Sequence, residues 1–204
     1  NHRLMYETFN VKAERASTVW QVHGADVVLV DGPVRNRRWI ALADAMVTNR
    51  RNTPLVMRYA DCTPLLFHDA VRGVIGIAHA GWRGTVLGVG SKVIKTMAQA
   101  YGCKPADIQV GIGPSIGPRR YQVGEEVVAE VQAYFGTIDG LIRRDPGDGT
   151  AYLDLWAANT FDLKRAGVTQ IDVSKICTAE NTQDFYSHRA EKGRTGRFGA
   201  VMTL

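Results

Sequence analysis

Cysteine is scarce in this chain of 204 residues, which contains only Cys62, Cys103 and Cys177. An odd number without paired spacing argues against a disulfide-stapled secreted domain and favours a reducing compartment. The chain also lacks an apolar run of the roughly 18 residues that a membrane-spanning helix needs. No signal peptide is recognisable. We therefore expect a cytoplasmic protein without a membrane partner.

Long runs of one charge are absent as well, although the net charge is +5. Without a basic tract we expect no nucleic-acid partner, and the surplus positive charge favours a small anion such as phosphate or a nucleotide. A mildly basic surface without a partner is the alternative. Hydrophobic residues make up 45% and charged residues 22%, as is usual for one globular domain of this length.

Apolar patterns and turn residues predict a mixed set of strands and helices. The expected strands are 26–31, 55–59, 64–68, 73–79, 108–112 and 171–177, and the expected helices are 85–102, 124–135 and 154–166. Asp154 is a suitable N-cap for the last helix and Gly167 a suitable stop. Because this order is not a regular βαβ series, we predict a single α+β domain over 1–204, with a mixed β-sheet and packed helices.

Three residues stand where a strand ends or begins, and their side chains suit a metal. His23 precedes the first predicted strand, Cys62 lies between two apolar strands, and His79 ends another. Such positions present side chains to a cleft on a rigid support. Two imidazoles and a thiolate suit zinc and leave a fourth position open, as in catalytic zinc sites. Taken one by one, each is more often a packed or hydrogen-bonded residue than a metal ligand.

Arginines close to glycine or aromatic residues are candidates for anion binding. Arg83 stands at the start of a predicted helix, in Gly-Trp-Arg-Gly, where free N–H groups favour an anion. Arg189 ends Phe-Tyr-Ser-His-Arg, and Arg197 follows closely. Arginine beside aromatic rings suits phosphate or base recognition. An exposed basic loop is the alternative. The glycine- and proline-rich loop 111–118, followed by Arg119 and Arg120, matches no nucleotide fingerprint.

Several short motifs occur together along most of the chain. They occupy residues 21–24, 43–48, 60–64, 78–84, 113–117, 187–189 and 195–197. In this order they resemble the YfiH-like laccase-domain family, and the His-Ala-Gly-Trp-Arg-Gly string beside the Asp-Cys string is the most specific part. Relatives of that kind begin with a longer segment carrying Arg-Gly-Gly and Ser-Leu-Asn stretches. This chain lacks both, so we expect a share of the substrate pocket to be missing.

The resemblance implies an α+β enzyme that binds zinc through His23, Cys62 and His79 and processes purine nucleosides. Purine nucleoside phosphorylase, adenosine deaminase and methylthioadenosine phosphorylase activities are implied, with nucleosides and phosphate as partners. We expect Arg83 and Arg189 to help hold phosphate. Deamination also needs a general acid or base, and Asp61, beside Cys62, is the candidate, with a buried structural aspartate as the alternative.

Three other functions are weighed against this one. Older usage calls such proteins multicopper polyphenol oxidases, but that machinery needs on the order of ten histidines. The chain has five, so it has ligands for a single copper at most. A cysteine hydrolase would use Cys62 as nucleophile and His79 as base. A metal-binding module without catalysis is the third alternative.

Overall fold

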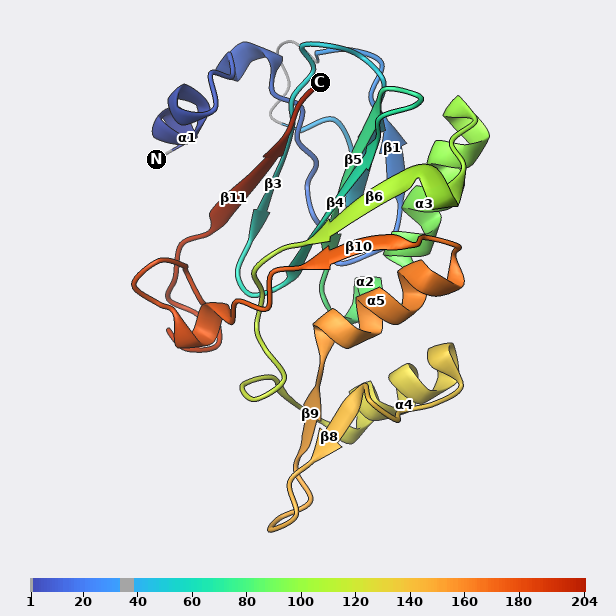
Figure 1. The fold of residues 1–204 in the computed structure, drawn as a ribbon. Helices are drawn as coiled ribbons and strands as arrows, with labels where there is room; N and C mark the ends of the chain where they lie inside the picture. The colour runs from blue at the N-terminus through green and yellow to red at the C-terminus, as the bar shows by residue number, and fades with distance from the viewer. Residues whose placement is uncertain (1, 34–38) are drawn as a thin grey trace.

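A mixed sheet of six strands forms the centre of the computed structural model, which describes residues 2–33 and 39–204 (Figure 1). Its strands, in spatial order, are β1 (Val27–Leu29), β2 (Ala45–Thr48), β5 (Val74–Ala80), β4 (Thr63–Asp69), β6 (Ile108–Ile112) and β10 (Gln170–Val173). The two outer pairs, β1 with β2 and β6 with β10, are parallel, and the inner pairs are antiparallel. The α+β fold with a mixed sheet is therefore confirmed.

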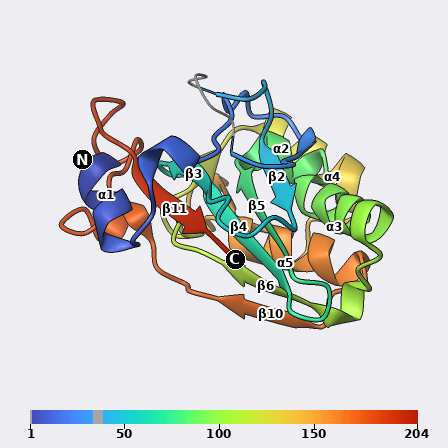
Figure 2. The same cartoon turned by 90° about the horizontal axis from the view of Figure 1, so that it is seen from above.

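Both faces of this sheet are covered near its centre, which explains why β5 is buried at all seven of its residues. Helices α3 (Val89–Tyr101) and α5 (Leu155–Arg165) lie on one side, and β3 (Leu55–Tyr59) paired with β11 (Phe198–Met202) lies on the other (Figure 2). The apolar side chains of α3 that recur every three to four residues are buried against the sheet, as the sequence predicts.

The segment predicted as one helix from residue 85 is two helices. Helix α2 (Trp82–Val86) begins earlier, and a break at Leu87 and Gly88 separates it from α3. Gly88 has a φ of 69°, a left-handed conformation that ends one helix and turns the chain into the next. Helix α2 begins directly after the end of β5 and contacts β5, α3, α5 and α4 (Glu125–Phe135).

A smaller unit projects below the main sheet in Figure 1. It consists of α4 (Glu125–Phe135) and a three-stranded antiparallel sheet of β7 (Gln122–Val123), β9 (Ala151–Leu153) and β8 (Ile142–Arg144). Val131, Phe135 and Leu153 belong to its apolar core, which continues into α5. At the N-terminus lies α1 (His2–Thr8). Among the described residues, no helix combines the length and apolarity required to cross a membrane.

Candidate metal centre and its pocket

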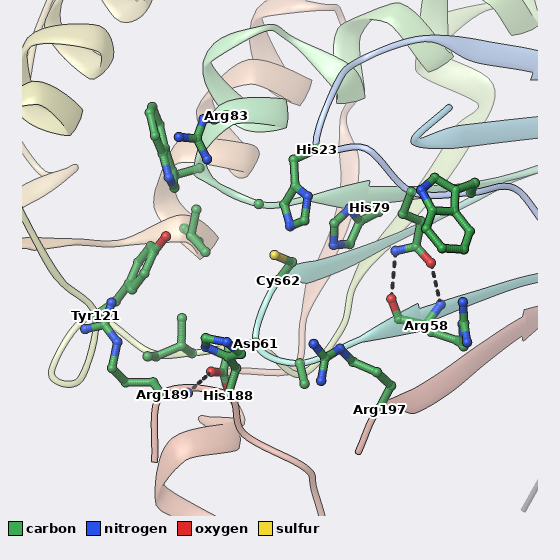
Figure 3. A pocket seen from close by; sticks show the side chains of 17 residues that line it. His23, Arg58, Asp61, Cys62, His79, Arg83, Tyr121, His188, Arg189 and Arg197 are labelled. Carbon is green, nitrogen blue, oxygen red and sulfur yellow. Dashed lines mark hydrogen bonds between the residues drawn. The ribbon is translucent and has the colours of Figure 1, made fainter. Parts of the chain in front are cut away.

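The structure brings together the three predicted metal ligands from three separate segments. His23 lies in the loop before β1, Cys62 directly before β4, and His79 near the end of β5. Because Pro64 on β4 pairs with His79 on β5, the antiparallel register places Cys62 beside that end of β5. The candidate ligand atoms of the three residues all lie within 4.8 Å of one another. Figure 3 shows the three side chains converging at the centre of one pocket.

Asp44 holds the His23 loop in place, and it is fully buried. Its carboxylate accepts hydrogen bonds from three successive backbone N–H groups, those of Val22 (3.1 Å), His23 (3.0 Å) and Gly24 (2.6 Å). His23 itself has a φ of 61°, a conformation that side-chain-bearing residues rarely adopt. The three bonds to one carboxylate stabilise this turn, and the turn aims the His23 ring at His79, whose ring centroid lies 4.9 Å away.

The same carboxylate orients the second histidine. Asp44 Oδ1 lies 2.8 Å from His79 Nδ1, so Nδ1 carries the proton and Nε2 is left to face the other two ligands. Burial alone would lower the pKa of His79, but the bonds and charges of Asp44 and Cys62 outweigh it and raise the pKa to about 9. Burial would raise the pKa of Asp44, and His79 and the N–H of Gly24 bring it below its usual value.

Cys62 is the anionic member of the set. Burial would raise the pKa of its thiol, but hydrogen bonds from His23 and His79 and the charge of both rings lower the pKa to about 6. The thiolate is therefore the prevailing form at neutral pH, and it is the form that binds metals. Behind it, Tyr59 is fully buried and donates its hydroxyl to the Ala78 carbonyl oxygen at 3.1 Å.

Gly81 leaves the space that the thiolate occupies. A Cβ at this position would lie 2.8 Å from Cys62 Sγ and 3.5 Å from the His23 ring, closer to the sulfur than real Cβ atoms come. The donor set is two imidazoles and one thiolate, gathered within 4.8 Å of one another, and the Asp44 carboxylate is bonded to the His79 ring and to the His23 backbone. These features fit zinc, or a single copper, as a resident metal.

A pocket of about 540 Å³ surrounds the three ligands. Its lining includes the predicted Asp61, Arg83, Arg189 and Arg197. It also includes Gln21 and His188, which stand in the sequence motifs without an assigned role, and three residues that the sequence did not single out, namely Trp20, Arg58 and Tyr121. Arg119 and Arg120 do not line it, and Arg119 pairs instead with Glu180 at 2.9 Å on the surface.

Asp61 and Arg189 are linked across the pocket wall. The carboxylate of Asp61 accepts bonds from Thr178 Oγ1 (2.6 Å) and from the backbone N–H of Arg189 (2.8 Å). The guanidinium of Arg189 donates to the Gln122 carbonyl oxygen at 3.0 Å and lies 5.3 Å from the centroid of the Tyr121 ring. Burial and the charge of Cys62 raise the pKa of Tyr121, so its hydroxyl stays protonated.

Comparisons with known proteins place this arrangement in a family. All 204 residues match the model of a family described as "Multi-copper polyphenol oxidoreductase laccase". The chain belongs to this laccase family. A solved structure is also similar to this chain, namely the crystal structure of the hypothetical protein YfiH from Bacillus licheniformis. The TM-score is 0.93 at 31% sequence identity, and the match covers 98% of this chain and 78% of that one.

Two relatives of this laccase-family chain have names that describe an activity. A purine nucleoside phosphorylase from Deinococcus radiodurans is 41% identical over 184 residues, which cover 90% of this chain and 68% of the relative. Adenosine deaminase RL5, from an unknown prokaryotic organism, is 32% identical over 185 residues, which cover 87% of this chain and 70% of the relative. Despite the description of the family, these two names refer to nucleoside chemistry.

Proposed function

We propose that this chain is a zinc-dependent purine nucleoside phosphorylase that also acts on methylthioadenosine and deaminates adenosine. The observation that carries the proposal is the His23, Cys62 and His79 set at the centre of a pocket whose walls are rich in arginine. The names of the two relatives support the nucleoside chemistry. A zinc ion held by His23, Cys62 and His79 would supply a Lewis acid there.

In phosphorolysis an oxygen of phosphate bonds to C1′ of the sugar as the bond from C1′ to the purine nitrogen breaks. The electron pair of that bond leaves with the purine, which then takes up a proton, and the sugar passes through an oxocarbenium-like transition state. The protein therefore has to bind a phosphate dianion and to stabilise the charge on the departing base. Guanidinium groups do both without changing their own protonation state.

We assign phosphate binding to Arg83 and Arg189. Within the described part of the chain, neither has a carboxylate within ion-pair distance, so their charge is available to a ligand. Figure 3 shows Arg83, Arg189 and Tyr121 on the same side of the metal ligands. The protonated Tyr121 hydroxyl offers one further hydrogen-bond donor between them.

We assign proton transfer in adenosine deamination to Asp61, where water replaces the amino group at C6 and ammonia leaves. Asp61 also positions Arg189. Its carboxylate accepts bonds from Thr178 and from the Arg189 N–H, and the second bond fixes the backbone from which the Arg189 side chain extends. Each oxygen of Asp61 accepts one of these bonds and keeps a second lone pair for a reacting proton.

The test is a product assay on inosine, adenosine and methylthioadenosine, with and without phosphate, using metal-free and zinc-reloaded protein. We expect release of the free base only when zinc and phosphate are both present, and no turnover by His79→Ala. Undiminished turnover by the metal-free protein or by His79→Ala would refute the metal mechanism. Base release without phosphate would identify a hydrolase instead.

A cysteine hydrolase is the second candidate, favoured by the position of Cys62 within 4.8 Å of two imidazoles. The two candidates differ in what zinc does to the thiol. In the metal enzyme, zinc protects Cys62 from alkylation by iodoacetamide, because the sulfur is a ligand. Rapid alkylation of Cys62 in zinc-saturated protein, together with loss of activity, would favour the hydrolase.

A further inference from the structure

The pocket has two ends, and both combine arginine with an aromatic ring. Figure 3 shows Arg83 and Tyr121 on one side of Cys62, and Arg58 and Arg197 on the other. At the first end both rings are covered by cations. The Arg83 guanidinium lies 4.5 Å from the ring centroid of its neighbour Trp82, and the Arg189 guanidinium lies over Tyr121. The two guanidinium groups thus occupy these ring faces, and the N–H groups at their edges remain available to bind an anion.

At the second end the ring is available. Trp20 lines the pocket, is 45% exposed, and has no cation over it among the described residues. Its ring meets Trp39 at a tilt, with centroids 4.8 Å apart and planes at 52°. A tilted neighbour supports the indole without covering it as a parallel ring would. Exposed indole at a pocket wall is a surface on which a planar heteroaromatic ring stacks favourably.

The backbone around Trp20 is fixed. Its N–H donates to the Ala41 carbonyl at 2.9 Å, and its carbonyl accepts from the Ala43 N–H at 3.1 Å. The side-chain amide of Gln21 donates to the carbonyl oxygen of Arg58 at 2.7 Å and accepts from the Arg58 N–H at 3.0 Å. Gln21 thus completes the edge of β3 as a neighbouring strand would, and it holds Trp20 and Arg58 next to one another.

Arg58 and Arg197 bring unneutralised donors to this end. Neither has a carboxylate within ion-pair distance in the described ranges. Among the described residues, Arg197 donates only to the carbonyl oxygens of Gly196 (2.7 Å) and Thr195 (3.4 Å), which lie in its own loop. A guanidinium donates at every nitrogen and accepts nowhere, so a ligand that fits here presents acceptors.

We propose that the Trp20 end binds the purine base and that Arg58 and Arg197 make it prefer 6-oxopurines, with adenosine and methylthioadenosine as slower substrates. This inference rests on the proposed function, because it gives the second end of the pocket to the base. Hypoxanthine and guanine present two acceptors, O6 and N7, to which arginine binds in a bidentate manner. Adenine presents an amino donor at C6, which would face the donors of the arginines and leave them unpaired.

Arg58 and Arg197 also stabilise the transition state of the proposed reaction. As the bond from C1′ to the purine breaks, its electron pair moves into the base and charge builds on the ring and on O6. Two guanidinium groups at that edge stabilise the departing anion more than the neutral nucleoside, which favours the transition state. Their removal is therefore expected to lower kcat as well as to raise KM for inosine.

Kinetic specificity is the first test, with kcat/KM measured for inosine and adenosine by the zinc-loaded protein at saturating phosphate. We expect the wild type to prefer inosine. Arg58→Ala or Arg197→Ala should reduce the inosine-to-adenosine ratio by about 5- to 150-fold, which corresponds to the roughly 1–3 kcal/mol of a bidentate arginine contact. Arg143→Ala removes an arginine stacked on Tyr152 outside the pocket and should leave the ratio unchanged. A preference for adenosine, or ratios unchanged in both pocket variants, would overturn the inference.

Equilibrium binding is the second test, and it does not depend on turnover. Hypoxanthine should quench the tryptophan fluorescence of the zinc-loaded protein, with adenine binding more weakly. Most of this quenching should disappear in Trp20→Phe and persist in Trp82→Phe. The reverse pattern would overturn the base subsite. Quenching that follows this pattern in a protein without phosphorolysis would refute the proposed function and leave the base subsite standing.

Discussion

At the scale of single residues, Asp44 does the most to shape the candidate metal centre. One buried carboxylate fixes the backbone of His23 and the ring of His79, so two ligands from separate segments share one support. In the sequence, Asp44 stands within the motif at residues 43–48, and no local pattern indicates its role. A carboxylate that accepts backbone N–H groups has no local signature, because its partners are distant in the chain.

Asp44→Asn is expected to weaken zinc binding by about 10- to 100-fold, as the loss of a group that orients a metal-binding histidine usually does. An amide would offer one oxygen and place a donor against the N–H groups that the carboxylate now accepts. The measurement is a competition titration against a chromophoric chelator.

Asp162→Asn is the matched control for Asp44→Asn. Asp162 is an equally buried aspartate that accepts bonds from Ser91 and Tyr134 and does not line the pocket. Equal loss of zinc affinity in both variants would mean that Asp44 acts only through general stability.

Gly81→Ala is expected to remove bound zinc while leaving a folded chain. The added methyl group would lie 2.8 Å from Cys62 Sγ, so the sulfur has to move away from the two histidines. Gly111→Ala is the control, because a Cβ there would meet nothing closer than 3.9 Å. Elemental analysis after dialysis gives the metal content, and thermal unfolding reports the fold. Full zinc occupancy in Gly81→Ala would contradict this account of the site.

At the scale of helices and strands, the sequence-based predictions are most accurate where interactions between residues close in the chain determine the structure. Asp154 was predicted as an N-cap, and its carboxylate accepts from the Ala157 N–H at 3.0 Å at the start of α5. The predicted strand 171–177 is wrong beyond Val173, because β10 pairs with β6 only over four residues. Strand β11 was not predicted at all, since its partner is β3, far away in the chain. Such long-range pairing leaves no local pattern.

Asp154→Ala is expected to destabilise the protein by about 1 kcal/mol through loss of this cap. For a domain of this size that loss lowers Tm by roughly 2–4 °C. The measurement is thermal unfolding followed by circular dichroism. Asp148→Ala, in an exposed turn, is the control and should change Tm by less. A Tm equal to that of the wild type would mean that solvent replaces the cap.

At the scale of the whole molecule, the fold assembles the candidate centre from segments that lie apart in the chain. His23, Cys62 and His79 were predicted as ligands from their residue types and their places at strand ends. The structure brings them together through the pairing of β4 with β5 and the turn around Asp44. The Trp20 end of the pocket was not predicted. Arg58 comes next to Trp20 through the two hydrogen bonds between the Gln21 side-chain amide and the Arg58 backbone, and these residues are far apart in the chain. Contacts of this kind depend on tertiary structure alone.

Because the three ligands meet only in the folded chain, zinc should stabilise the native state. A free zinc concentration of 100 times Kd is expected to add about 2.7 kcal/mol. The measurement is the Tm of metal-free protein over a zinc titration, compared with that of Cys62→Ala. The variant should respond weakly, since it lacks the anionic ligand. An equal rise in Tm for both proteins would place the bound zinc elsewhere.

The turn that Asp44 holds also bears on how a metal ion enters and leaves. The three bonds of Asp44 to backbone N–H groups and its bond to His79 are formed within the protein itself. His23 and His79 are therefore already positioned before an ion binds. Little chain entropy remains to be lost when an ion arrives. Exchange of one bound ion for another would then require no refolding of the segments that carry the ligands.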